Sequence, residues 1–117
     1  MTALSASRPI DLDLVFGALA DATRRGILSR LARGAATVNE LVAPSGLSQP
    51  TVSQHLKVLE VAGLVTRGRE ARYRPVALNA KTLEAAAQWI GDYKRCWEDS
   101  LDQLEDFVKT LEGKKAL

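Results

Sequence analysis

The 117-residue sequence contains one cysteine and one histidine, and these two shortages exclude several kinds of site. A single cysteine, Cys96, leaves no partner for an intramolecular disulfide and no second thiolate for a metal cluster within one chain. With one histidine, His55, a metal centre lacks a second histidine ligand, and a histidine-based catalytic site lacks its partner residues. The sequence has no glycine-rich phosphate loop either. We therefore expect no catalytic activity, no metal site and no cofactor.

Long apolar runs are missing as well. No segment approaches the roughly 18 consecutive apolar residues that a membrane span needs, and the N-terminus has no basic stretch followed by an apolar signal core. With 46% hydrophobic residues, the chain has the length and composition of one domain with one modest core. We expect a cytoplasmic protein with a flexible arm over residues 1–10, one domain over residues 11–112 and a tail over residues 113–117.

Acidic residues are scarce in the middle of the chain. Residues 45–79 carry one lysine and four arginines against two glutamates, whereas residues 80–117 carry six basic and eight acidic residues. The overall formal charge of +2 hides this difference. A basic middle that is followed by an acidic segment indicates that the middle faces a polyanion and that the end does not.

The first third of the chain has the spacing of two amphipathic helices. Leu12, Val15 and Phe16 recur at intervals of three and four residues, which predicts a helix from about residue 11. Asp21 is typical of the N-cap of a second helix, and Gly34 is expected to end it. The other faces of this second helix carry four arginines: Arg24, Arg25, Arg30 and Arg33.

Two shorter helices follow, joined by a tight turn. Thr37 and Glu40 form the pattern of a capping box, and the helix that they open must end before Pro44. Ser48 is typical of the N-cap of the next helix, which closes at Gly63. A three-residue turn that contains glycine separates them, and this arrangement is typical of a helix-turn-helix.

A β-hairpin is predicted next, because Leu64–Arg69 and Arg72–Leu78 carry β-branched and aromatic residues on either side of Glu70 and Ala71. A helix-turn-helix that is followed by a hairpin is a winged helix. We therefore expect a mostly α fold with a β-hairpin wing, in the order ααααββα.

The last predicted helix, near Lys81 to Glu112, is longer than one small domain can cover. Its apolar residues alternate at spacings of three and four over about four heptads. They are Leu83, Ala86, Ile90, Tyr93, Trp97, Leu101, Leu104, Val108 and Leu111. We expect a homodimer held by the first and last helices, because their apolar residues exceed one small core. The interface residues that we predict are Leu12, Phe16, Ile90, Trp97, Leu101 and Leu104.

The helix that begins at Ser48 has the composition of a surface that reads DNA bases. Off its apolar stripe lie Ser48, Gln49, Thr51, Ser53, Gln54, His55 and Lys57. Glutamine can bond adenine through two hydrogen bonds, and lysine neutralises phosphate. A merely solvated helix would also be polar, but it normally mixes acidic and basic residues, and this face has no acid.

Arginines dominate the predicted wing. Arg69 and Arg72 flank its tip, where cations suit a narrow DNA minor groove. Arg67 and Arg74 are as well explained by solvated strand positions as by DNA contact. We therefore assign Arg69 and Arg72 to DNA binding and leave the other two open.

Three segments together resemble the ArsR-type family of bacterial repressors: Phe16–Arg25 (FGALADATRR), Ser48–Leu59 (SQPTVSQHLKVL) and Ala62–Val65 (AGLV). The resemblance implies a dimeric winged helix that binds a palindromic operator in double-stranded DNA and represses its own operon. Ala22 departs from the proline that many relatives have there. That proline only presets the first helical turn.

Metal-sensing members of that family place paired cysteines on the first helix of the helix-turn-helix, or Asp and His ligands on the last helix. Residues 38–42 have no cysteine, and the last helix has no histidine. The resemblance therefore points to the branch that does not sense metals, with an unknown small molecule as the inducing signal. Two other functions stay open: a thiol-based redox or persulfide sensor that uses Cys96, and a winged helix used only for protein interaction.

Overall fold

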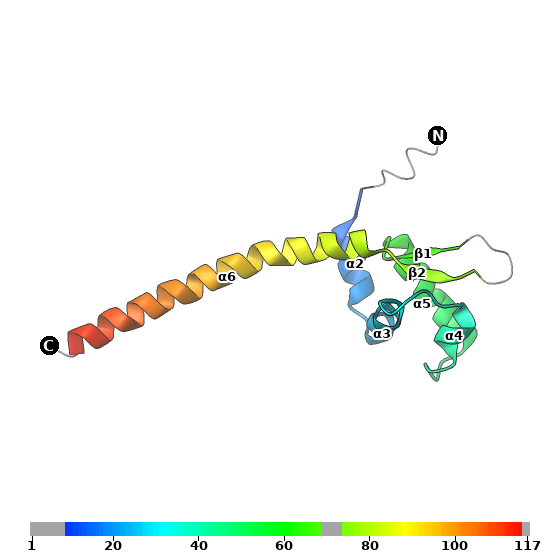
Figure 1. Ribbon diagram of the computed structural model, residues 1–117, viewed down its shortest axis with the longest axis horizontal. Helices are drawn as coiled ribbons and strands as arrows, with labels where there is room; N and C mark the ends of the chain where they lie inside the picture. Colours follow the sequence, from blue (N-terminus) through cyan, green and yellow to red (C-terminus); the bar gives the residue numbers. More distant parts are fainter. Residues whose placement is uncertain (1–8, 69–73, 116–117) are drawn as a thin grey trace. The chain divides into compact units, whose positions relative to one another are not determined.

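The computed structural model describes residues 9–68 and 74–115. Its elements in chain order are α2 (Leu12–Leu19), α3 (Ala22–Leu31), α4 (Val38–Val42), α5 (Gln49–Val61), β1 (Val65–Arg67), β2 (Val76–Leu78) and α6 (Ala80–Lys115) (Figure 1). This order confirms the predicted winged helix. The chain divides into two compact units, one that ends at Ala86 and one that begins at Ala87.

The helices of the first unit begin where their capping residues predict. The side chain of Asp21 accepts a hydrogen bond from the backbone N–H of Arg24 at 3.1 Å, and Ser48 accepts one from the N–H of Thr51 at 3.3 Å. These bonds satisfy N–H groups that have no partner inside their own helix. Gly63 adopts a φ of 79° just after α5, so the predicted end of that helix is also confirmed.

The first turn of α4 contains the complete capping box. The hydroxyl of Thr37 accepts from the N–H of Glu40 at 3.2 Å, and the carboxylate of Glu40 accepts from the N–H of Thr37 at 3.1 Å. A helix of only five residues has little cooperativity of its own, so this reciprocal pair and the burial of Leu41 stabilise it.

Acid is expected to weaken this capping box. The pKa of Glu40 lies below its usual value of 4.5, because its carboxylate accepts hydrogen bonds from the N–H and the hydroxyl of Thr37. A lowered folded-state pKa gives stability that is complete above that usual value and is lost as the pH falls below it. The difference in free energy of unfolding between wild type and Glu40→Ala, from urea titrations, should therefore shrink from neutral pH to about pH 3. An unchanged difference would contradict this reading.

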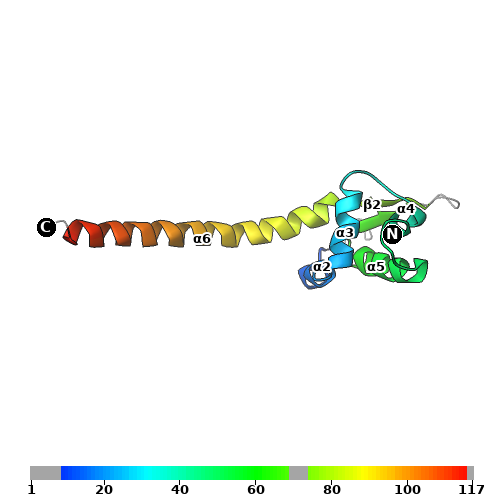
Figure 2. The same ribbon diagram turned by 90° about the horizontal axis from the view of Figure 1, so that it is seen from below.

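One hydrophobic core joins all elements of the first unit. α2, α3 and α5 pack against one another (Figure 2). The apolar stripe of α5 consists of Val52, Leu56 and Leu59, and it is fully buried there. Other buried side chains come from every remaining element of this unit: Val15, Ile27, Leu28, Leu31, Leu41, Leu64, Val65, Val76 and Ala86. This packing fixes the position of α5.

The hairpin pairs β1 and β2 in antiparallel register, with Thr66 opposite Ala77. Ala36 adds a short bridge, since its N–H donates to the carbonyl of Val76 at 3.0 Å and its carbonyl accepts in return at 2.7 Å. A Cβ on Gly68 would lie 2.8 Å from the ring of Pro75, so only glycine fits there. Both strands are shorter than predicted, and the tip, residues 69–73, lies outside the described residues.

α6 starts one residue before its predicted first residue and ends three after its predicted last one. In the first unit its opening turns bury Thr82 and Ala86. In the second unit the described side chains are exposed, including the apolar ones. No helix in the described ranges is both long and apolar enough to cross a bilayer.

Candidate nucleic-acid interface

The polar face of α5 stands away from the core. Gln54 and Lys57 are exposed on the side of the helix opposite the buried stripe, and Ser48 and Gln49 are exposed at its N-terminal end. Thr51 and Ser53, which flank this face, are half-buried. Six of the seven residues predicted on this helix therefore border a single surface, and His55 is the exception.

The N-terminal end of α5 combines its cap with hydrogen-bonding groups that remain accessible. Ser48 Oγ and Thr51 Oγ1 lie 2.8 Å apart, so one hydroxyl donates to the other and the second hydroxyl proton stays available. The end of a 13-residue helix also carries partial positive charge. Because the N–H of Gln49 and this dipole both favour anions, the end of α5 suits a phosphate of the DNA backbone.

His55 is turned toward α3 and not into this surface. Its Nδ1 lies 3.2 Å from Nη1 of Arg24 and 3.9 Å from Oδ2 of Asp21, and its side chain is only 20% exposed. A guanidinium donates and never accepts, so Nδ1 accepts and the proton of a neutral ring is on Nε2. The structure thus gives His55 a positioning role that the sequence did not indicate. Its contact with DNA stays a prediction.

Arg24 joins three elements around the end of α2. Its Nε donates to the carbonyl of Ala18 at 2.7 Å and its Nη2 to that of Gly17 at 3.2 Å. Arg25 donates to the next carbonyl, that of Leu19, at 2.8 Å. The carbonyls at the end of a helix lack the usual partners four residues ahead, although that of Gly17 also accepts from the N–H of Ala20 at 3.3 Å. The two arginines therefore complete the helix end and hold α3 against it.

The sequence placed Arg24 and Arg25 on the outer faces of their helix, and it missed this role. A signal was available, because cations are unfavourable in the first turns of a helix. Here both guanidinium groups turn back to the C-terminal end of α2, where positive charge is favourable. The carboxylate of Asp21 lies in the same cluster, and the N–H of Arg24, followed by the charge of its side chain, keeps the pKa of Asp21 below its usual value of 3.8.

The base of the wing is tied to α5. Nε of Arg67 lies 3.2 Å from Oε2 of Glu60, and the side chain of Arg67 is mostly buried. This N–H is directed off the line to the oxygen, so the contact is an ion pair without a good hydrogen bond. Arg67 is therefore a packed strand residue, whereas Arg74 is exposed. The predicted wing contacts Arg69 and Arg72 lie outside the described residues.

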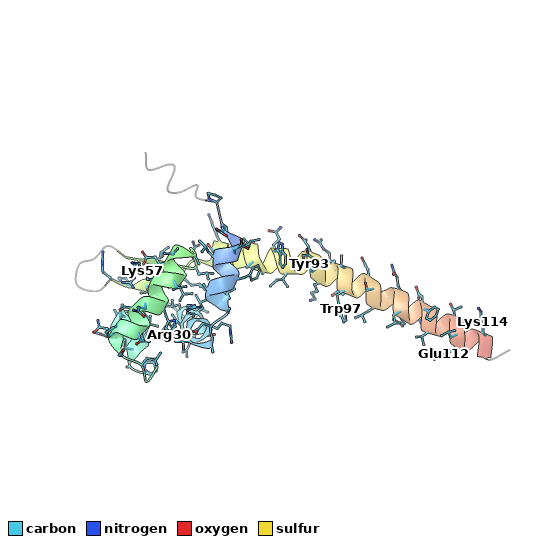
Figure 3. The ribbon with its side chains drawn as sticks, turned by 180° about the vertical axis from the view of Figure 1, so that it is seen from behind. Arg30, Lys57, Tyr93, Trp97, Glu112 and Lys114 are labelled. Carbon is cyan, nitrogen blue, oxygen red and sulfur yellow. The ribbon has the colours of Figure 1, made fainter. Side chains whose placement is uncertain are left out.

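The residues predicted for a dimer interface divide between the two units. In the first unit, Leu12 and Phe16 are partly buried against the core. In the second unit, four are exposed along α6: Ile90, Trp97, Leu101 and Leu104. Figure 3 shows Trp97 and Tyr93 projecting from this helix. Sequence reasoning left out Phe107, which is also exposed on this helix.

Cys96 is exposed on α6. Its accessibility leaves open a reaction with an oxidant, and no neighbouring thiol exists in this chain to form a disulfide. Within residues 9–68 and 74–115, no group of three or more His, Cys, Asp or Glu side chains is placed to hold a metal ion.

Residues 21–67 match the sequence family described as "Bacterial regulatory protein, arsR family". The chain is 42% identical over 89 residues to the HTH-type transcriptional regulator Rv2034 of Mycobacterium tuberculosis, an alignment that covers 76% of this chain and 80% of that protein. It is also 32% identical over 76 residues to the transcriptional repressor SdpR of Bacillus subtilis, which covers 65% of this chain and 84% of the repressor.

Solved structures agree with these sequence relatives. The crystal structure of the ArsR family transcriptional regulator RHA00566 superposes with a TM-score of 0.69 at 37% identity, over 74% of this chain and 96% of that one. The solution structure of the homodimeric winged helix-turn-helix DNA-binding domain of Mb0332 from Mycobacterium bovis gives a TM-score of 0.57 at 26% identity, over 79% and 82% of the two chains.

Proposed function

This chain belongs to the ArsR family of bacterial regulatory proteins and is a DNA-binding transcriptional regulator, and from this premise we propose that it works as a homodimeric repressor of its own operon. Each subunit places α5 in the major groove of one half of a palindromic operator and its wing against the adjacent minor groove. Such regulators carry out no chemical step of their own, and their activity is the occupation of a DNA site.

The observation that carries the proposal is the polar face of α5. It presents glutamine, serine, threonine and lysine side chains without an acidic residue from Ser48 to Leu59. The first acidic side chain after them, Glu60, is paired with Arg67. The polar face of α5 thus carries no negative charge over the residues that would contact the bases. Just after these residues, the negative charge of Glu60 is neutralised by Arg67.

The second part of the proposal is the dimer. The homodimeric solution structure of Mb0332 is that of a related fold, and SdpR is named a repressor. In this chain, the exposed stripe of α6 offers the apolar surface that a second copy would cover. A dimer with two-fold symmetry presents two copies of α5, which is why a palindromic site is expected.

The third part concerns the signal and the compartment. Residues 38–42 have no cysteine and α6 has no histidine, so we place the chain in the branch that does not sense metals. An organic effector is then the simplest inducer. Because its target is the bacterial chromosome, we place the protein in the cytoplasm.

Fluorescence anisotropy with two labelled duplexes tests the function. One duplex holds the region upstream of the regulator's own gene, and the other has the same composition in scrambled order. We expect the upstream duplex to bind at least about 10³-fold more tightly at physiological salt, as is usual for specific protein–DNA complexes. Equal affinity for both duplexes would refute the proposal and favour a winged helix that serves only protein interaction.

A further inference from the structure

A second surface of the first unit has the features of a ligand site. A pocket of about 420 Å³ lies between α3, α4 and the turn that precedes α5. We propose that this pocket is the effector site and that it binds a small amphiphilic anion, such as a medium-chain or aromatic carboxylate. This inference rests on the proposed function for its regulatory meaning. The volume of the pocket falls within the range of small-molecule sites, roughly 300–1,000 Å³.

The walls of the pocket are apolar. Ile27 and Leu41 contribute from α3 and α4, and both are otherwise buried in the core. Leu47 contributes from the turn, yet it remains partly open to solvent at 37% exposure. An apolar side chain left open beside an apolar wall gains from covering by a hydrocarbon group. The body of the ligand is therefore expected to be apolar.

The rim of the pocket is cationic. Arg30 lines it from the last turn of α3, and Arg33 lines it from the turn two residues beyond the end of that helix. The guanidinium group of Arg30 already has partners within the protein. It donates to the carbonyl of Gly34 at 3.0 Å and lies 3.8 Å from the carboxylate of Glu40. Within the described residues, no hydrogen bond or ion pair engages the exposed side chain of Arg33. A ligand carboxylate or sulfonate would supply that missing anion.

The absence of a side chain at Gly26 leaves part of the pocket volume empty. It lies in the middle of α3, where glycine weakens a helix relative to alanine. A Cβ at this position would meet nothing within 4 Å, and its φ does not require glycine. Gly17 in α2 is equally open, so the glycine alone does not define the site. Together with the apolar walls and Arg33, however, it leaves space that a larger side chain would fill.

The pocket touches the segment that positions α5. Ser45 lines it and shapes the turn, because its hydroxyl donates to the carbonyl of Val42 at 2.7 Å and accepts from the N–H of Leu47 at 3.0 Å. Gly46 in this turn has a φ of 71°, a conformation that favours glycine. A ligand wedged between α3 and the turn would shift the N-terminal end of α5. Ligand and operator therefore favour different positions of the turn and weaken each other's binding.

The pocket is distinct from the polar face of α5. Figure 3 shows Arg30 on α3 and Lys57 on α5, at different parts of this unit. A DNA phosphate near the turn would also be attracted by Arg33, but it would gain nothing from Ile27, Leu41 and Leu47. The apolar walls favour an amphiphile, and the experiment separates the two.

Binding is measured on the full chain with 8-anilinonaphthalene-1-sulfonate, an aromatic sulfonate whose fluorescence increases in apolar sites. We expect saturable binding of one probe per chain and displacement by decanoate. Decanol, which lacks the charge, should compete at least about 10-fold less well, and inorganic phosphate should not compete. Competition by phosphate as strong as by decanoate, or no saturable binding, would overturn the inference.

Substitutions locate the site. Gly26→Leu fills the pocket and should weaken decanoate binding at least about 10-fold, while Gly26→Ala leaves most of the space and most of the affinity. Both variants replace glycine in a helix, so neither is expected to lose its fold, and circular dichroism checks this. Arg33→Gln should weaken decanoate about 10-fold, whereas Lys81→Gln, which removes an exposed cation outside the pocket, should not. Equal decanoate affinity in wild type and Gly26→Leu would overturn the assignment.

Operator binding is recorded in parallel. Decanoate should release the operator duplex from wild type and not from Gly26→Leu, which still binds DNA. If wild type binds no duplex specifically, the proposed function fails, whatever the probe does. If wild type binds the operator and decanoate releases it equally from both proteins, only the effector site is wrong.

Discussion

Replacing Gln54 with alanine is expected to weaken binding to the operator by about 5- to 150-fold, equivalent to about 1–3 kcal/mol, with a much smaller effect on random duplex DNA. Gln54 is exposed on the side of α5 that faces away from the core. Its amide can donate and accept at once, which is what a bidentate contact with adenine requires. Random DNA lacks that base at a fixed place, so its affinity should change little and the ratio of operator to random affinity should fall.

The control for this substitution is Val61→Ala. Val61 is exposed on the same side of α5, two turns closer to its C-terminal end, and it has no group that can hydrogen-bond a base. It should therefore leave the ratio of operator to random affinity unchanged. Anisotropy titrations of both variants on both duplexes measure that ratio. A Gln54→Ala variant with the wild-type ratio would show that Gln54 makes no base-specific contact.

Substitutions in the wing should change DNA binding in a different way. We predict that Arg69 and Arg72 each place a cation near the DNA backbone or in the minor groove. Arg69→Ala or Arg72→Ala should therefore weaken binding to operator and random DNA together. The same titrations at several salt concentrations serve here, because each lost phosphate contact reduces the slope of log affinity against log salt by about one. Loss of specificity in these variants would reverse our assignment of the two elements.

Local signals in the sequence were enough to place the helices, because each cap acts within one turn of its own helix. Asp21, Thr37 and Ser48 each bond an N–H group three residues away, and the structure confirms all three. The hairpin was found by composition, but its register was not. Strand β2 also forms the bridge from Ala36 to Val76, a contact between segments 40 residues apart that no local pattern reveals.

The candidate site was predicted least well where side chains bond across elements. His55 has the spacing of a DNA-facing residue, yet it bonds Arg24, 31 residues away in the sequence. Arg24 in turn reaches carbonyls six and seven residues before it. A one-dimensional pattern shows which residues are polar, but the partner of each depends on how α2, α3 and α5 pack. The polar face of α5 was predictable because it follows from the position of its buried stripe alone.

Replacing Leu104 with alanine is expected to weaken the proposed dimer at least about 100-fold. Leu104 is exposed on α6, in the second unit, in register with Ile90, Trp97 and Leu101 along a heptad stripe. Burying a leucine side chain contributes about 1.5–3 kcal/mol, and two-fold symmetry counts each substitution twice, so about 3–6 kcal/mol is lost per dimer. Sedimentation velocity over a dilution series measures the dissociation constant.

Asp102→Ala is the matched control, because Asp102 is also exposed on α6 but lies outside the apolar stripe. It should leave the dissociation constant within a few-fold of wild type. The helical signal offers an independent readout: an exposed helix without tertiary partners is marginal in water, so α6 should lose helicity as the Leu104→Ala dimer dissociates on dilution. If wild type sediments as a monomer at micromolar concentration, the stripe serves another purpose and the dimer is excluded. If Leu104→Ala and Asp102→Ala dissociate alike, the dimer exists but another surface holds it together.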